Sequence, residues 1–212
     1  MTHLAADELE RLIEGERNLL LSLGKVPAIR SLDAAASSAL LAAIKQELPL
    51  YDNFCVLKTN GEAFASAIPL RQPSDSADLS WFQRAVQTRG FTVGEFQVDR
   101  ISGKQVLVAA YPVLDDAGQI RAVLNSSLGL TSLNAIIKQT QLPPEATILV
   151  MDRKGTILAR HPEPERWVGC AMPEADTVKT ILARRQGSAE AAGVDGVKCI
   201  FSFMPVDGAD DG

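Results

Sequence analysis

The chain has 212 residues, of which 46% are hydrophobic and 22% are charged, which is close to the usage of ordinary globular proteins. With 21 basic and 26 acidic residues its formal net charge is −5, which argues against nucleic acid and anionic lipid surfaces as partners. No apolar run approaches the roughly 18 residues of a membrane-spanning helix, and the N-terminus does not have the pattern of a signal peptide. These features fit a cytosolic protein, and equally a soluble piece of a longer chain.

Metal-binding and catalytic signatures are not found in the sequence. Three cysteines, Cys55, Cys170 and Cys199, and two histidines do not have the spacing of metal ligands, so neither a metal nor a cofactor is expected. Small thiols buried in strands are the favoured interpretation, and a Cys170–Cys199 disulfide in an oxidising compartment stays open. Because there is no nucleophile elbow, P-loop or zinc-protease helix, we expect no catalysis by this stretch.

The first 48 residues have a helical pattern of apolar residues. Leu9, Leu12, Ile13, Leu20 and Leu23 recur at steps of three and four residues, and a second apolar face extends to about residue 48. Gly24 and Pro27 interrupt the pattern, so it predicts either two helices or one long helix with a proline kink. Asp33 is the expected N-cap of the later segment.

From residue 49 to residue 142 the sequence predicts an antiparallel sheet with two helices. Asn60-Gly61 is a strong hairpin signal between the first two strands, and Pro143-Pro144 marks a domain boundary. The expected strands are Phe54–Leu57, Ala63–Ile68, Phe91–Asp99, Gln105–Val113 and Gln119–Leu130, and the expected helices are Ser80–Arg89 and Thr131–Thr140.

After that boundary the same order of elements starts again. Gly61 and Gly103 are 103 − 61 = 42 positions apart, and Gly155 and Gly196 are 196 − 155 = 41 positions apart. The expected elements are strands Ile148–Asp152 and Thr156–His161, helix Thr177–Arg185, and strands Gly187–Gly193 and Lys198–Val206. The fold class is therefore α/β (α+β), with a long N-terminal helical segment and two repeated units with antiparallel sheets, over 49–142 and 143–212.

The two copies differ at their ends. The first copy continues through a turn into Gln119–Leu130, whereas the second stops at Asp207–Gly212, in the equivalent turn. A sheet without its last strand would leave an unpaired edge, which proteins usually avoid. We therefore expect the second unit to be truncated and the natural chain to continue.

Several motifs in this order resemble the double Cache family, also called tandem PDC sensor domains. The motifs of the first copy are Leu48–Phe54, Asn60-Gly61, Ala65–Ala67, Trp81-Phe82, Ser102–Leu107, Tyr111–Val113 and Asp115–Gly118. Those of the second copy are Met151–Gly155, Asp195-Gly196 and Met204–Val206. The resemblance covers nearly the whole chain, and its specificity comes from the order and spacing of the motifs together.

This resemblance implies PAS-like units on the outer side of the cytoplasmic membrane of a bacterial receptor. It implies flanking transmembrane helices that are absent from this chain, a periplasmic location and a homodimer in the full receptor. The cytoplasmic output of such receptors is commonly a histidine kinase, a diguanylate cyclase or a chemoreceptor signalling region, and a histidine kinase is our first expectation. An interaction module that dimerises through its helices without a ligand is the alternative from another class.

By the same resemblance, a small molecule binds in the membrane-distal unit, between the sheet and residues 70–100. Aromatic walls, a cation on a short helix, a tyrosine on an apolar strand and polar residues inside an apolar run are the features that suit such a pocket. The candidate ligand-binding residues are Trp81, Phe82, Arg84, Tyr111, Asn125 and Ser127.

Each candidate also has a purely structural interpretation. Trp81 and Phe82 suit a core, Arg84 suits a solvated helix face, and Tyr111 can cap the core with its hydroxyl in water. The run from Asn125 to Ser127 is the strongest anomaly, because buried polar groups need partners.

The type of ligand follows from two departures from the family pattern. Relatives that bind free amino acids carry an Arg or a similar residue two positions before the Trp and an Asp near the start of the last strand. Leu79 and, in an uncertain alignment, Ser127 occupy these positions here. Because no carboxylate is evident to hold an ammonium group, a small organic acid or a neutral solute is expected rather than an amino acid.

Overall fold

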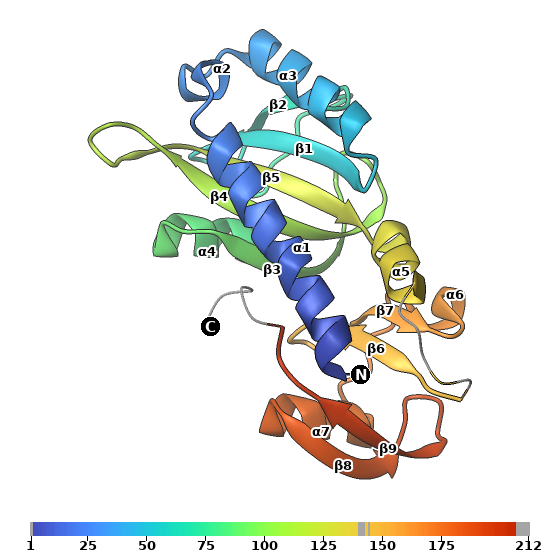
Figure 1. Ribbon diagram of the computed structural model, residues 1–212. Coiled ribbons are helices and arrows are strands. Elements are labelled where there is room, and N and C mark those ends of the chain that lie inside the picture. The colour runs from blue at the N-terminus through green and yellow to red at the C-terminus, as the bar shows by residue number, and fades with distance from the viewer. Residues whose placement is uncertain (1, 140–142, 144, 207–212) are drawn as a thin grey trace. The chain divides into compact units, whose positions relative to one another are not determined.

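A computed structural model of the chain describes residues 2–139, 143 and 145–206 (Figure 1). Over those residues, no helix is both long enough and apolar enough to cross a membrane. The described chain divides into two compact units, which we call the first unit (residues 14–132) and the second unit (residues 2–13 and 133–206). The expected closing turn at 207–212, together with Thr140 and Pro144, lies outside the described residues.

Three helices precede the first strand: α1 (Thr2–Leu23), α2 (Pro27–Arg30) and α3 (Ala34–Glu47). Of the two alternatives, separate helices are correct, because α1 ends before Pro27 and the chain turns at Leu32, where φ is 58°. Asp33 caps α3 as predicted, since its Oδ1 accepts a hydrogen bond of 3.0 Å from the backbone nitrogen of Ala36.

The first unit contains a five-stranded antiparallel sheet with strand order β2-β1-β5-β4-β3. The helix α4 (Ser80–Thr88) connects the second strand to the third. The predicted order of elements is confirmed here: the strands are β1 (Tyr51–Lys58), β2 (Ala63–Ser66), β3 (Thr92–Val98), β4 (Gln105–Leu114) and β5 (Ile120–Gly129).

The two faces of this sheet are covered by different helices. Side chains alternate along a strand, so Ser126 points to the opposite face from its neighbours Asn125 and Ser127. Ser126 bonds to Glu16 of α1, and Figure 1 shows α1 crossing the sheet and α3 lying over β1 and β2. The other face carries the main apolar cluster, which includes Cys55, Leu57, Trp81, Phe82, Ala85, Val106, Val108, Ala110 and Val123.

The second unit repeats these elements with short strands. It contains α5 (Leu130–Gln139), β6 (Ile148–Met151), β7 (Ile157–His161), α6 (Pro164–Trp167), α7 (Asp176–Arg184), β8 (Gly187–Ala192) and β9 (Lys198–Phe203). Only the short helix α6 was not predicted. Within the described residues, β6 pairs with β7 and β8 pairs with β9, which makes two separate two-stranded sheets.

The duplication extends to single backbone hydrogen bonds. The nitrogen of Ser76 donates to the oxygen of Gly61 over 2.9 Å, and the nitrogen of Met172 donates to the oxygen of Gly155 over 3.0 Å. Each glycine follows the first strand of its copy and has a positive φ, 90° at Gly61 and 75° at Gly155. The same loop-to-hairpin contact is therefore built twice.

Helix α5 groups with the second unit because Asn134 bonds to β7. The Nδ2 of Asn134 donates to the oxygen of Leu158, and its Oδ1 accepts from the nitrogen of Arg160. The division by contacts therefore falls near residue 133, before Pro143-Pro144, and the predicted boundaries at residues 48 and 142 stay predictions. The three thiols are free; Cys55 is buried as expected, whereas Cys170 and Cys199 are exposed.

Candidate ligand-binding site

A hollow lies on the α4 side of the first sheet. The hollow is small and partly open to solvent. Strands β1 and β5, the loop before α4, the start of α4 and the end of β3 all contribute to it. The lining residues are Cys55, Leu57, Ser74, Ser76, Leu79, Trp81, Gln97, Asp99, Arg100, Ile101 and Asn125.

The hairpin glycine places the two serines of the hollow. Because Gly61 has no side chain, the loop passes directly over it, and a Cβ built there would lie 2.4 Å from the nitrogen of Ala77. The nitrogen of Ser76 donates to Gly61, and the oxygen of Ser74 accepts from the nitrogen of Ala63 over 2.8 Å. The loop is thereby fixed to the start of β2, with both serines at the hollow.

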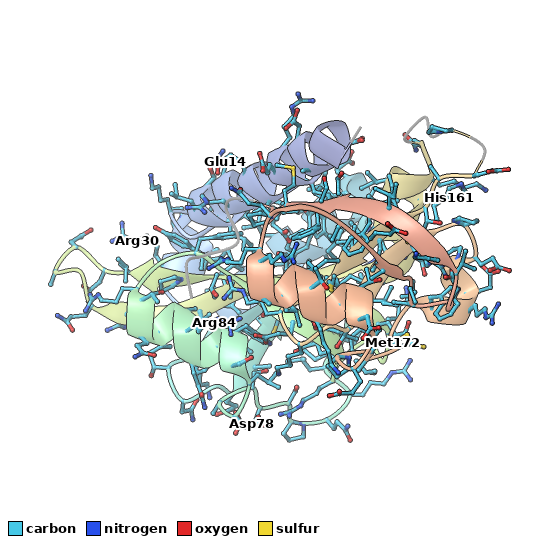
Figure 2. All side chains as sticks on the ribbon, turned by 90° about the horizontal axis from the view of Figure 1, so that it is seen from below. Glu14, Arg30, Asp78, Arg84, His161 and Met172 are labelled. Atoms are coloured by element: carbon cyan, nitrogen blue, oxygen red, sulfur yellow. The ribbon has the colours of Figure 1, made fainter. Side chains whose placement is uncertain are left out.

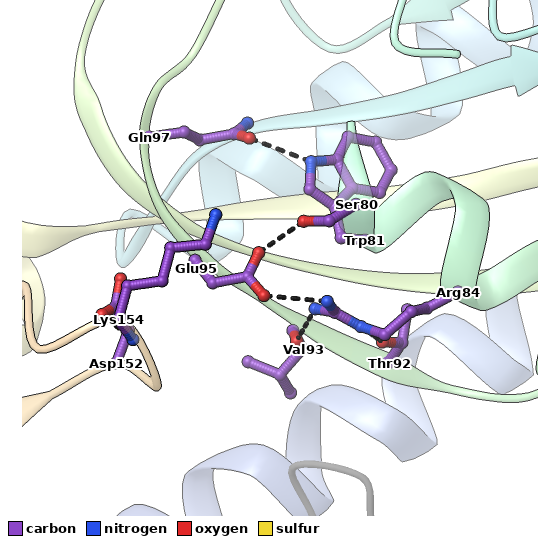
Figure 3. Close-up of polar contacts among 9 residues, drawn as sticks. All are labelled: Ser80, Trp81, Arg84, Thr92, Val93, Glu95, Gln97, Asp152 and Lys154. Atoms are coloured by element: carbon purple, nitrogen blue, oxygen red, sulfur yellow. Dashed lines mark hydrogen bonds and ion pairs between the residues drawn. The ribbon is translucent and has the colours of Figure 1, made fainter. Parts of the chain in front are cut away.

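Trp81 forms one wall in a fixed orientation. Its indole Nε1 donates a hydrogen bond of 2.9 Å to the Oε1 of Gln97 on β3 (Figure 3). A Cβ built at Gly94 would lie 3.1 Å from Trp81, so the bare backbone of β3 allows the ring to pack this closely. Phe82 contacts Trp81 edge to face, with ring centroids 6.2 Å apart, and belongs to the apolar cluster.

Asp99 brings a carboxylate to the hollow at the end of β3. The side chain is buried, and its Oδ2 accepts a hydrogen bond of 2.8 Å from the backbone nitrogen of Ser102. Burial first, and then the negative charge of Asp99, raise the pKa of the Cys55 thiol, which therefore stays protonated at neutral pH. The site combines a carboxylate with an uncharged thiol.

Arg100 adjoins Asp99 but is already paired. Its Nη1 and Nη2 donate to the two carboxylate oxygens of Asp78, each over 2.8 Å. Hydrogen bonding in this pair raises the pKa of Arg100 and lowers the pKa of Asp78. Figure 2 labels Asp78 in the loop before α4. Asp78 offsets the charge of Arg100, and the Asp99 carboxylate and the Oδ1 of Asn125 are acceptors at the hollow.

A row of buried polar side chains continues from the hollow across the sheet. Asn53, Asn125 and Ser127 lie on the same face, because Asn53 pairs with Ser127 and Cys55 pairs with Asn125 in the register of β1 and β5. Ser66 donates a hydrogen bond of 3.0 Å to the Oδ1 of Asn53. Within the described part of the chain, the Oδ1 of Asn125, the Oγ of Ser127 and the Nδ2 of Asn53 have no hydrogen-bond partner.

The structure brings only some of the candidate residues together. Trp81 and Asn125 line the hollow, and Ser127 is buried on the same face of β5. Tyr111 pairs with Leu124, so its side chain points to the opposite face of the sheet from Asn125. The assignment of all six residues to a binding site stays a prediction.

Arg84 holds α4 against β3. Its Nη1 donates to the Oε1 of Glu95 and its Nη2 to the oxygen of Val93, each over 2.8 Å, and its Nε donates to the Oγ1 of Thr92 (Figure 3). Ser80 donates a hydrogen bond of 2.5 Å to the other oxygen of the Glu95 carboxylate. These contacts give the Arg84 side chain a structural role, and Arg84 is not one of the residues that line the hollow.

Four residues of the hollow were not predicted from the sequence: Gln97, Asp99 and the two loop serines, Ser74 and Ser76. Asp99 lies between a strand and a Ser-Gly turn, where an Asp is a common turn residue and does not indicate a binding site. Gln97 is a polar residue on a strand where polar and apolar residues alternate, and this pattern predicts a solvent-exposed side chain. The useful signal is that Gln97, near the end of β3, and Asp99, just after it, are two residues apart, so an extended backbone places both side chains on one side.

Comparisons with known proteins give the same fold over the whole chain. The family model dCache_1, described as a Cache domain, matches residues 1–210. The extracellular domain of rpHK1S-Z16, named as a histidine kinase, is 18% identical with a TM-score of 0.83, over 97% of this chain and 86% of that chain.

Two further relatives are a chemoreceptor domain and a kinase. The ligand-binding domain of the Pseudomonas fluorescens chemoreceptor CtaA, solved with L-isoleucine, is 22% identical with a TM-score of 0.74, over 98% of this chain and 83% of that chain. Sporulation kinase D of Bacillus subtilis (strain 168) is 23% identical over 142 residues, which are 65% of this chain and 28% of that protein. The chain therefore spans about a quarter of the length of this curated relative.

The family model covers both repeated units and the helices before them, and the solved relatives share the fold over at least 97% of the chain. The chain therefore belongs to the Cache domain family, as its resemblance to double Cache sensors predicted.

Proposed function

We propose that the chain is the extracytoplasmic sensor domain of a bacterial histidine kinase, in the periplasm and anchored by membrane helices outside residues 1–212. Membership of the Cache family supports a sensor, and the relatives named as kinases support this output over a diguanylate cyclase or a chemoreceptor. The proposed domain senses and does not catalyse. It acts in a homodimer of the full receptor.

The proposed ligand occupies the hollow of the first unit. One observation carries this assignment: the Oδ1 of Asn125 is a buried acceptor that faces the hollow and has no partner among the described residues. An unsatisfied buried polar group costs about 1–3 kcal/mol. A ligand that donates a hydrogen bond to Asn125 removes this cost and gains the contact with Trp81.

The chemistry of the hollow favours a ligand with hydrogen-bond donors. An organic acid or a neutral solute was expected because the sequence showed no carboxylate for an ammonium group. The structure has such a carboxylate at the hollow, that of Asp99. Of the two, a neutral solute with hydroxyl groups suits Asp99 and Asn125, and an acid does not. L-isoleucine and GABA, the molecules bound in two related chemoreceptor domains, each carry an ammonium group. We therefore include amines and amino acids with the hydroxyl-bearing solutes.

Strand β5 connects the proposed ligand to α1. Asn125 faces the hollow, while the adjacent Ser126 points to the other face and donates a hydrogen bond of 2.5 Å to Glu16 of α1. A ligand that shifts β5 by a fraction of an ångström therefore acts on the contact that holds α1. In the proposed mechanism, the ligand favours one of two positions of α1, which transmits the signal as a small shift or rotation.

A thermal-shift experiment tests this function. The chain is heated with GABA, L-isoleucine, ethanolamine, glycerol or succinate, each at several concentrations. A ligand that binds the folded state raises Tm with its concentration, by RT ln(1 + [L]/Kd) in free energy. We expect a rise with the donor-bearing probes that Asn125→Leu loses, and no such Asn125-dependent rise with succinate. An Asn125-dependent rise with succinate alone overturns the ligand class, and no rise with any probe supports a ligand-free interaction module.

A further inference from the structure

The second unit contains a buried cation at a place where the first unit has a serine. Arg160 lies on β7 with 4% of its surface exposed. Its Nη2 donates a hydrogen bond of 2.5 Å to the Oδ2 of Asp195, in the turn between β8 and β9. The guanidinium carbon lies 4.4 Å from the centre of the Trp167 ring, a cation–π contact that fixes its orientation.

Asp195 satisfies only part of this group. The Nε and Nη1 atoms of Arg160 and the indole Nε1 of Trp167 are buried and have no hydrogen-bond partner in the described part of the chain. Arginine has no acceptor of its own, so each of these donors needs an oxygen from elsewhere. Unsatisfied donors on a buried cation are among the most costly polar groups in a protein interior.

The register of the two copies places Arg160 on the face that corresponds to the hollow. Leu149 pairs with Arg160, and Cys55 pairs with Ser66, and the two pairs are offset by the same 94 positions (149 − 55 and 160 − 66). In the first unit this face carries Cys55 at the hollow. The second unit therefore has the guanidinium of Arg160 at the position where the first unit has the hydroxyl of Ser66.

We propose that Arg160 and Trp167 form a second binding site, for a small oxyanion such as a carboxylate or a phosphate. Hydrogen bonds from a guanidinium are strongest to charged oxygens, and one oxyanion offers enough lone pairs for all three donors. The guanidinium of Arg166 lies 4.8 Å from the centre of the same Trp167 ring and adds positive charge. This site differs in place and in ligand charge from the proposed site of the first unit.

The indole N–H signals in nitrogen–proton NMR spectra provide the test. The chain has two tryptophans, so two indole signals are expected, and Trp167→Phe assigns them by the loss of one. Sodium acetate and sodium phosphate are titrated at constant ionic strength against sodium chloride. We expect the Trp167 signal to move saturably with acetate or phosphate, and not with chloride, while the Trp81 signal stays in place. The two titrations show whether a carboxylate or a phosphate is preferred.

Variants separate this site from a general salt effect. Arg160→Gln is expected to abolish the shift of the Trp167 signal, and the exposed Arg166→Gln is expected to retain it with at most a few-fold weaker affinity. Because loss of a buried cation can unfold the unit, calorimetric titration of Trp167→Phe gives a second measure, with an expected affinity loss of several-fold. If the Trp167 signal moves with neither acetate nor phosphate, or moves equally with chloride, the proposal is wrong. Asn125→Leu is expected to leave the titration of the Trp167 signal unchanged, because Asn125 lies at the proposed site of the first unit. This control distinguishes the second site from the first.

Discussion

The carboxylate of Glu16 on α1 accepts a hydrogen bond of 2.5 Å from the hydroxyl of Ser126, in the middle of the first sheet. Glu16 is almost fully buried, and this desolvation raises the pKa of its carboxyl from 4.5 to about 7, although the bond to Ser126 opposes the shift. The contact that ties α1 to the strand of Asn125 therefore changes its charge near neutral pH.

We predict that the stability of the first unit falls as the pH rises. The pKa of Glu16 is higher in the folded state than in the unfolded chain, so its contribution is complete below about pH 4.5 and is lost as the pH passes about 7. A shift of this size corresponds to at most about 3 kcal/mol. Urea unfolding between pH 5 and pH 8 should show this decline, whereas Glu16→Gln should give a flatter profile. Identical profiles would show that Glu16 does not titrate in this range.

A second prediction concerns the hairpin glycine. Gly61→Ala should destabilise the first unit by about 2–4 kcal/mol, because φ is 90° and the new Cβ would meet the backbone of Ala77. Gly103→Ala is the matched control: its φ is 72°, but no atom lies within 4 Å of the new Cβ, so about 1 kcal/mol is expected. Urea midpoints of the two variants measure the difference. Equal losses would mean that the loop is not held against Gly61.

The Arg84 cluster should affect stability rather than ligand binding. The Arg84 and Glu95 side chains are 25% and 12% exposed, so Arg84→Met removes an ion pair with a mostly buried carboxylate and should cost about 2–3 kcal/mol. Arg30→Met removes the exposed pair with Asp116 and should cost less than about 1 kcal/mol. If Arg84→Met keeps full stability but loses a thermal shift given by the wild type, Arg84 belongs to the binding site after all.

Much of the fold follows from local pattern. The Asn-Gly turn, the alternating strands and the Asp33 cap are encoded by neighbouring residues, and all are found where they were expected. The position of Asp99 is different, because its burial depends on the turn that folds Ser102 back onto it. The contacts of Arg84 with β3 likewise depend on tertiary packing, which no short-range pattern encodes.

Asp99 gives a prediction about ligand charge. Asp99→Asn keeps the size of the side chain and an oxygen for the nitrogen of Ser102, but removes the negative charge from the hollow. We expect tenfold or greater weakening of a probe with an ammonium group, such as ethanolamine, and a change of no more than a few-fold for glycerol. Calorimetric titration compares the two probes. Equal effects on both would mean that the carboxylate does not contact the ammonium group.

The most direct test of ligand binding in the hollow is calorimetric titration of the wild type and of Asn125→Leu with GABA, L-isoleucine and glycerol. Leucine has the same branched arrangement of heavy atoms as asparagine but cannot accept a hydrogen bond, so the hollow loses the acceptor that has no partner among the described residues. We predict that at least one probe binds the wild type at a site where its affinity for Asn125→Leu is at least tenfold weaker. Binding of equal strength to both proteins, or to neither, would contradict this prediction.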